Sequence, residues 1–243
     1  MAFFNSSPKT EARIISVIGM HRSGTSCLAG SLEQKGLFLG DVHNWNEHNQ
    51  KGNRENDTIA ELNESVLQHN GGTWYDPPTK ISWTRKHEKQ RNTIIESFEA
   101  SGMPVWGFKE PRALLTMEFW RAALPDMEFV GTYRHPYLVA KSLEKRDSMP
   151  NDYAIKLWES YNLAMMSIYD QQPFPVVSFD LDSDEYLRQV NTIVEHLALP
   201  KASSQEIFLD MQLKNTLDDL PAGTISPDAM ALFEKLNSLP KTM

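Results

Sequence analysis

Short apolar runs alternate with longer segments of helical periodicity along most of the chain. Four runs are rich in β-branched and aromatic residues, as buried parallel strands are; they span residues 13–19, 105–108, 128–133 and 176–179. The remaining periodic segments predict helices at about 25–35, 58–69, 84–100, 113–124, 136–146, 153–169 and 184–197. This alternation predicts an α/β fold, in which helices cover both faces of a central parallel sheet.

Two stretches follow neither period. Residues 40–57 and 70–82 are rich in Asn, Gly, Asp and Pro, and we expect long irregular segments of the kind that often carries function. Beyond Pro200 the pattern weakens to one or two short helices. The sequence therefore predicts one domain over residues 1–243, with an N-terminal arm at 1–12 and a C-terminal helical extension at 201–243.

The segment between the first strand and the first helix reads GMHRSGTS, from Gly19 to Ser26. It has the two glycines and the spacing of a P-loop, but Thr25 stands where a nucleotide hydrolase has its lysine. The glycines allow close backbone approach, and successive N–H groups at a helix N-terminus favour an anion. Arg22 adds a fork-shaped cation from inside the loop. The alternative is an ordinary turn between strand and helix.

The later strands do not end in the acidic residue that phosphoryl-transfer enzymes use to hold magnesium. The runs VWGF and MEFVGTY lead into Lys109 and Arg134 instead of an aspartate that would hold magnesium. We therefore expect no metal site. Ser142 lies about two helical turns beyond Arg134, so the two side chains suit a second phosphate site, although each alone is typical of a protein surface.

The lysine-free loop and the Arg134 and Ser142 pair together resemble the PAPS-dependent sulfotransferases, of the bacterial type whose loop reads R-S-G-T-S. The resemblance covers most of residues 13–200 and implies a P-loop-like, three-layer α/β/α domain. It implies that 3′-phosphoadenosine 5′-phosphosulfate (PAPS) is the donor and PAP the product. The 3′-phosphate would lie at Arg134 and Ser142, and the 5′-phosphosulfate at His21, Arg22, Ser23, Gly24, Thr25 and Ser26. The basic C-terminal segment of many relatives is not obvious here, and Lys214 is a weak match.

The resemblance also suggests the groups that carry out the transfer. Arg22 would neutralise the bridging and sulfuryl oxygens. Lys109 lies in WGFKEPR, which resembles the K-[DE]-P-R element of related enzymes, and would donate to the sulfuryl group or leaving phosphate; the alternative is a simple ion pair with Glu110 or another acid. Arg112 is a further candidate for holding donor or acceptor.

Glu55 is the predicted base for the acceptor. It lies in KGNREND, which resembles the K-G-x-x-E-[ND] stretch of bacterial relatives, with Asn53 and Arg54 in place of the usual aromatic residues. An acidic residue near a helix N-terminus is the plainer interpretation. The rival bases are His43, His48 and Glu110. Four aromatic residues in the irregular segments would either form the walls of an acceptor site or anchor the long loops to the core: Trp45, Trp74, Tyr75 and Trp83.

Composition and charge restrict the partners and the cellular location that we expect for this protein. A net charge of -8 and a pI near 5.4 argue against a general nucleic-acid binder. The one cysteine, Cys27, allows no intrachain disulfide, and no apolar run suits a signal peptide or a membrane span, so we expect a cytoplasmic protein. The acceptor, a small molecule, glycan or peptide, and the oligomeric state stay open.

Two other functions compete with this prediction. A P-loop kinase or nucleotide hydrolase with a degenerate loop would need magnesium and an acidic ligand at a strand end. A non-catalytic PAP-binding module would keep the fold without turnover.

Overall fold

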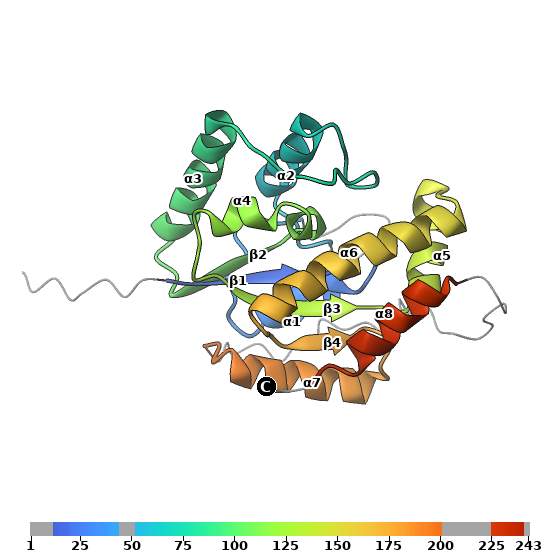
Figure 1. Cartoon of the computed structure of the whole chain (residues 1–243). Helices are drawn as coiled ribbons and strands as arrows, with labels where there is room; N and C mark the ends of the chain where they lie inside the picture. Colours follow the sequence, from blue (N-terminus) through green and yellow to red (C-terminus); the bar gives the residue numbers. More distant parts are fainter. Residues whose placement is uncertain (1–11, 44–51, 201–224, 241–243) are drawn as a thin grey trace, which may run out of the picture.

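The structure, a computed structural model, describes residues 12–43, 52–200 and 225–240. Its sheet contains β1 (Arg13–Ile18), β2 (Val105–Lys109), β3 (Glu128–Tyr133) and β4 (Val176–Ser178). All pairings are parallel and the strand order is β2-β1-β3-β4 (Figure 1). The predicted α/β fold with a central parallel sheet is confirmed.

The strands form because their side chains are apolar on both faces. Ile15, Val17 and Ile18 in β1 are fully buried, and β1 lies between β2 and β3. A parallel strand in this position needs cover on both sides, which explains its continuous β-branched run.

Helices supply that cover in two layers. On one face α1 (Thr25–Glu33) and α7 (Ser183–His196) share an apolar cluster with the sheet. The other face carries the second cluster, which Figure 1 shows above and in front of the sheet. Its helices are α2 (Asp57–His69), α3 (Arg85–Ala100), α4 (Met117–Arg121), α5 (Pro136–Asp147), α6 (Asn151–Gln171) and α8 (Pro227–Asn237).

Several helices start at a side chain that caps them. Asn56 accepts from the backbone N–H groups of Thr58 and Ile59 at the start of α2. Thr84 begins α3 and Asp182 begins α7 in the same way. Such caps satisfy N–H groups that the first helical turn leaves unpaired, and they fix where the irregular segments end.

The prediction of one continuous helix at 113–124 is wrong. The structure has a 3-10 turn, η1 (Pro111–Leu114), and then the short α4. Between them the hydroxyl of Thr116 donates to Asn63 Oδ1 at 2.8 Å. This bond to a distant helix holds Thr116 outside helical geometry, with φ -112° and ψ 21°.

The predicted C-terminal extension is described only in part. Within it α8 packs against α6 and α5. Lys214, His48 and Trp45 lie outside the described residues, as does the arm except Ala12. No helix in the described ranges is long and apolar enough to cross a membrane.

Candidate active site

The loop after β1 requires its glycines. Gly19 has φ 154°, and a Cβ there would lie 2.4 Å from the backbone oxygen of Thr132. Gly24 has φ 85°, and a Cβ there would lie 2.3 Å from Phe179 Cγ. Arg22 adopts a left-handed φ of 66° between them. The chain thus turns tightly from β1 into α1, the geometry that presents N–H groups to an anion.

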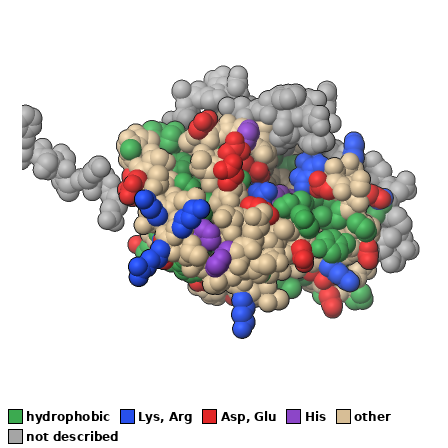
Figure 2. Space-filling model, turned by 90° about the horizontal axis from the view of Figure 1, so that it is seen from above, with side chains coloured by type: hydrophobic (Ala, Val, Ile, Leu, Met, Phe, Trp, Pro, Cys, Tyr) green, Lys and Arg blue, Asp and Glu red, His purple; other side chains and the backbone are tan. Residues whose placement is uncertain are grey.

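A cavity of ≈ 320 Å³ opens beside this loop. Figure 2, a view from above, shows Lys and Arg side chains around a hollow in this face. Its lining joins the loop to β2, α5 and the two irregular segments: His21, Arg22, Thr25, Ser26, Asn53, Glu55, Trp74, Lys109, Pro111, Arg112 and Arg146. Most predicted site residues therefore meet at one place.

Arg22 is held by a neutral partner. Its Nε donates to Ser142 Oγ at 2.7 Å. Within the described ranges no carboxylate lies at ion-pair distance from Arg22. Burial first, and then the charges of Arg146 and Arg134, lower the pKa of Arg22. This crowding of positive charge is relieved by an anion.

Lys109 and Glu55 form an ion pair, Nζ to Oε1, of 2.5 Å. The Lys109 side chain is 1% exposed. The second oxygen of Glu55 accepts from Asn53 Nδ2 at 2.9 Å, and the backbone oxygen of Asn53 accepts from Ser26 Oγ at 3.1 Å. A polar chain therefore connects the loop to the end of β2. The ion pair that was the alternative role for Lys109 is present, with Glu55 as its partner.

Arg112, which lines the cavity, joins it to a second network that includes the buried Glu110. Arg112 contacts Glu64 at 2.9 Å and Glu110 at 2.5 Å, and Asn63 Nδ2 donates to Glu110 at 2.8 Å. Burial raises the pKa of Glu110 to about 7, against the opposing charge of Arg112. Glu110 is fully buried and does not line the cavity.

Arg134 lies at the end of β3, beside the residues that follow β4. Its Nε contacts Asp180 at 3.3 Å, and its guanidinium lies 5.3 Å from the centre of the Phe179 ring. Asp180 also accepts from the backbone N–H of His135 at 2.6 Å. Burial lowers the pKa of Arg134, and Asp180 opposes this shift. Ser142 is hydrogen-bonded to Arg22, and Arg134 is near enough for its charge to lower the pKa of Arg22.

His21 is nearly enclosed, with 7% of its surface exposed. Its ring lies 4.6 Å from Trp74 and 5.9 Å from Tyr161, measured between ring centres. Burial lowers its pKa well below the ordinary value, and so do the nearby cations: Arg112, Arg146, Lys109 and Arg22. The imidazole is therefore neutral near pH 7.

Sequence reasoning missed Arg146. It lies one helical turn after Ser142 on α5, and its guanidinium stacks 5.3 Å from the centre of the Trp74 ring. The i, i+4 spacing from Ser142 places both on one helix face, and that signal was available in the sequence. The role of Asp180 had no such signal, because its partners come from another strand end.

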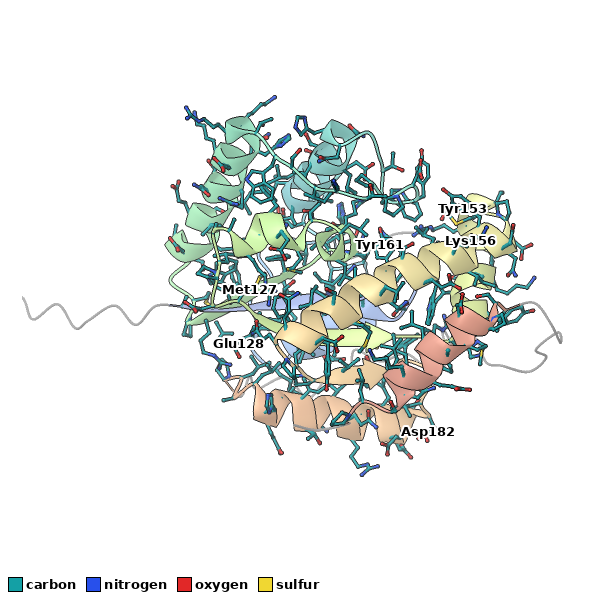
Figure 3. The ribbon with its side chains drawn as sticks, in the orientation of Figure 1. Met127, Glu128, Tyr153, Lys156, Tyr161 and Asp182 are labelled. Carbon is teal, nitrogen blue, oxygen red and sulfur yellow. The ribbon has the colours of Figure 1, made fainter. Side chains whose placement is uncertain are left out.

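The aromatic residues predicted as walls of an acceptor site lie in different surroundings. Trp74 lines the cavity, and its segment is tied to α6 by two hydroxyls: Tyr153 donates to the backbone oxygen of Tyr75 at 2.8 Å and Tyr161 to that of Trp74 at 2.9 Å (Figure 3). Tyr75 itself is 46% exposed.

Of the rival bases, His43 lies away from this cavity. Its Nε2 contacts Asp57 at 2.6 Å, in a smaller depression that also includes Glu55. Within the described ranges, no cluster of three or more His, Cys, Asp or Glu residues is able to hold a metal ion.

Comparison with solved structures places this geometry in a known fold. The sulfotransferase domain of the Synechococcus PCC 7002 olefin synthase superposes with a TM-score of 0.56 at 17% identity, over 95% of this chain and 98% of that one. The sulfotransferase domain of the curacin biosynthetic pathway superposes with a TM-score of 0.57 at 14% identity, over 95% and 99%. The chain therefore has the fold of a sulfotransferase domain. No protein-family model and no curated protein sequence matches it.

Proposed function

We propose that this protein is a sulfotransferase, which moves a sulfuryl group from PAPS to a hydroxyl or amine of an acceptor. One observation carries the proposal: Arg22, on the glycine-rich loop after β1, lines a cavity beside Lys109, and no carboxylate within the described ranges lies at ion-pair distance from it. The acceptor is a small molecule, glycan or peptide. All of residues 1–243 would form one such domain, working in the cytoplasm without a nucleic-acid partner.

The residues present suit a donor with two anionic ends. At one end Gly24, with its positive φ, lets the loop turn tightly while its backbone packs directly against Phe179. His21, Arg22, Ser23, Gly24, Thr25 and Ser26 would hold the 5′-phosphosulfate there. At the other end Arg134 and Ser142 would hold the 3′-phosphate, with Asp180 orienting Arg134. Buried arginines with hydrogen-bonded stems suit phosphate oxygens.

Bound PAPS supplies an activated sulfuryl group. Arg22 and Lys109 would stabilise the negative charge that develops on the oxygen being released, which is the largest contribution such a site makes. Glu55 fixes the position of Lys109, since both ends of this ion pair are buried or nearly so. Because cationic side chains stand where phosphoryl-transfer enzymes carry metal-binding acids, we propose a transfer without a metal.

Proton removal from the acceptor needs a base in the same cavity. Glu55 is the carboxylate of the predicted set that lines it, whereas Glu110 lies behind it and His43 beside another depression. Glu55 is thus the first candidate by position.

Thermal denaturation with excess PAP tests the donor assignment. A ligand that binds only the native state adds about 2.7 kcal/mol of stability at 100 times its Kd. We expect this gain with PAP, its loss in Arg134→Ala, and its retention in Arg188→Ala, a control on the exposed face of α7.

The competing functions give different results in the same experiment. Stabilisation by magnesium and ATP alone would replace the proposal with a kinase or hydrolase. Binding of PAP without any turnover of PAPS would favour a non-catalytic module.

A further inference from the structure

The imidazole of His21 is buried between aromatic rings without a hydrogen bond at Nε2 to any described residue. Its Nε2 is enclosed and has no hydrogen-bond partner within the described ranges. An unsatisfied buried polar atom costs about 1–3 kcal/mol, and such atoms in native structures commonly mark function. Packing against Trp74 and Tyr161 fixes the ring without hydrogen bonds. His21 also lines the cavity, so its ring lies beside any molecule that enters there.

The competing carboxylate is already engaged. One oxygen of Glu55 accepts from Lys109 and the other from Asn53. Protonating Glu55 would leave Lys109, 1% exposed, as an uncompensated buried charge, which is strongly unfavourable. Glu55 suits the task of holding Lys109 better than that of exchanging protons.

The charged groups around His21 keep it in the form that accepts a proton. Cations face it from the loop, β2, η1 and α5, while Tyr161 faces it from α6. Burial and these cations lower its pKa, and burial raises the pKa of Tyr161 well above its ordinary value. An anionic donor bound among Arg22, Lys109, Arg112 and Arg146 would neutralise the field that opposes protonation. Donor binding would thereby strengthen His21 as a base.

We propose that His21 is the catalytic base, which receives the proton of the acceptor hydroxyl through a ring nitrogen. This inference rests on the proposed sulfuryl transfer. As the proton moves to the imidazole, the acceptor oxygen forms the new O–S bond. The bond from sulfur to the phosphate oxygen breaks, and its electron pair stays on that phosphate. The imidazolium then releases its proton to water.

The first experiment follows His21 directly, with PAP as the probe. The chain has seven histidines, and in ¹⁵N-histidine NMR the His21 signals are those missing from His21→Gln. We expect the pKa of His21 to lie well below 6.5 in the free protein and to rise by about one pH unit or more with saturating PAP. A pKa that does not move when PAP binds overturns the inference.

The second experiment uses water as the acceptor, measured as release of PAP from saturating PAPS. His21→Gln keeps a polar side chain of similar size but accepts no proton, so we expect hydrolysis to fall about 100-fold or more. Because His21 also belongs to the proposed 5′-phosphosulfate set, PAP affinity is measured beside the rate, and we expect the rate to fall by a larger factor than the affinity. The control His69→Gln, at the exposed end of α2, should match the wild type.

The outcomes separate the two claims. Wild-type hydrolysis by His21→Gln, or a loss confined to Glu55→Gln, contradicts the role of His21 and leaves the sulfotransferase proposal standing. A wild-type protein that does not bind PAP contradicts the proposed function itself.

Discussion

The ends of β1 and β2 lie side by side, yet the cationic side chains at the two ends have different partners. After β1, Arg22 donates to the hydroxyl of Ser142, and among the described residues no carboxylate lies at ion-pair distance from it. After β2, Lys109 and Arg112 each contact at least one carboxylate. A cation that already has an acidic partner gains less from a new anion than one that has none. The comparison favours the proposal that the β1 end binds the anion and the β2 end supports it.

The largest expected effect comes from Arg22→Ala. Removing a charge-stabilising donor typically costs about 10²–10³-fold in rate, and we expect that loss in PAP release from PAPS. The free energy of unfolding should change by less than about 1 kcal/mol, since no ion pair is broken. Urea denaturation beside the rate assay measures both. Full activity in Arg22→Ala would refute the anion-binding role of the β1 end.

A smaller effect, on stability, should follow from Glu110→Ala at the β2 end. The substitution leaves Asn63 Nδ2 and one arm of Arg112 without their acceptor in a buried site, at a cost of about 3 kcal/mol. Urea denaturation measures the loss.

Glu64→Ala is the matched control for Glu110→Ala, because Glu64 binds the same guanidinium from a more exposed position. It should cost about 1 kcal/mol or less. Equal losses for the two substitutions would mean that burial does not distinguish these carboxylates.

A smaller effect than that of Arg22→Ala tests how the side chain of Arg22 is held in position. Ser142→Ala removes the acceptor of its Nε but leaves its charge, so PAP affinity should fall about tenfold, corresponding to about 1.4 kcal/mol. Calorimetric titration with PAP measures it, and Ser142→Thr, which keeps the hydroxyl, should lose less. An unchanged affinity in Ser142→Ala would show that Arg22 needs no such anchor.

Much of the fold could be predicted from local pattern. The strands at 128–133 and 13–19 are rich in apolar and β-branched residues, and the structure has strands there with bounds equal or nearly equal to those predicted. The helix at 113–124 could not be predicted correctly, because Thr116 bonds to Asn63, a residue of α2. The local periodicity of a sequence does not indicate a contact with so distant a residue.

The candidate site was predictable where the sequence itself is unusual. A loop with glycines at 19 and 24 and no lysine pointed to an anion, and the structure brings Arg22, Glu55 and Lys109 to one cavity. The pairing of Lys109 with Glu55 and that of Arg134 with Asp180 join segments far apart in the chain. Only the three-dimensional arrangement could reveal those pairs, and with them the neutral state of His21.

The contact between Gly24 and Phe179 has a consequence for how this chain can change during evolution. Because any side chain at position 24 would overlap the ring at 179, position 24 is not free to vary while the ring is present. A larger residue in the loop requires a smaller one after β4, and that change would also remove the ring that Arg134 stacks against. Among related sequences, positions 24, 134 and 179 should therefore change together, as a coupled set that a search for remote relatives can use.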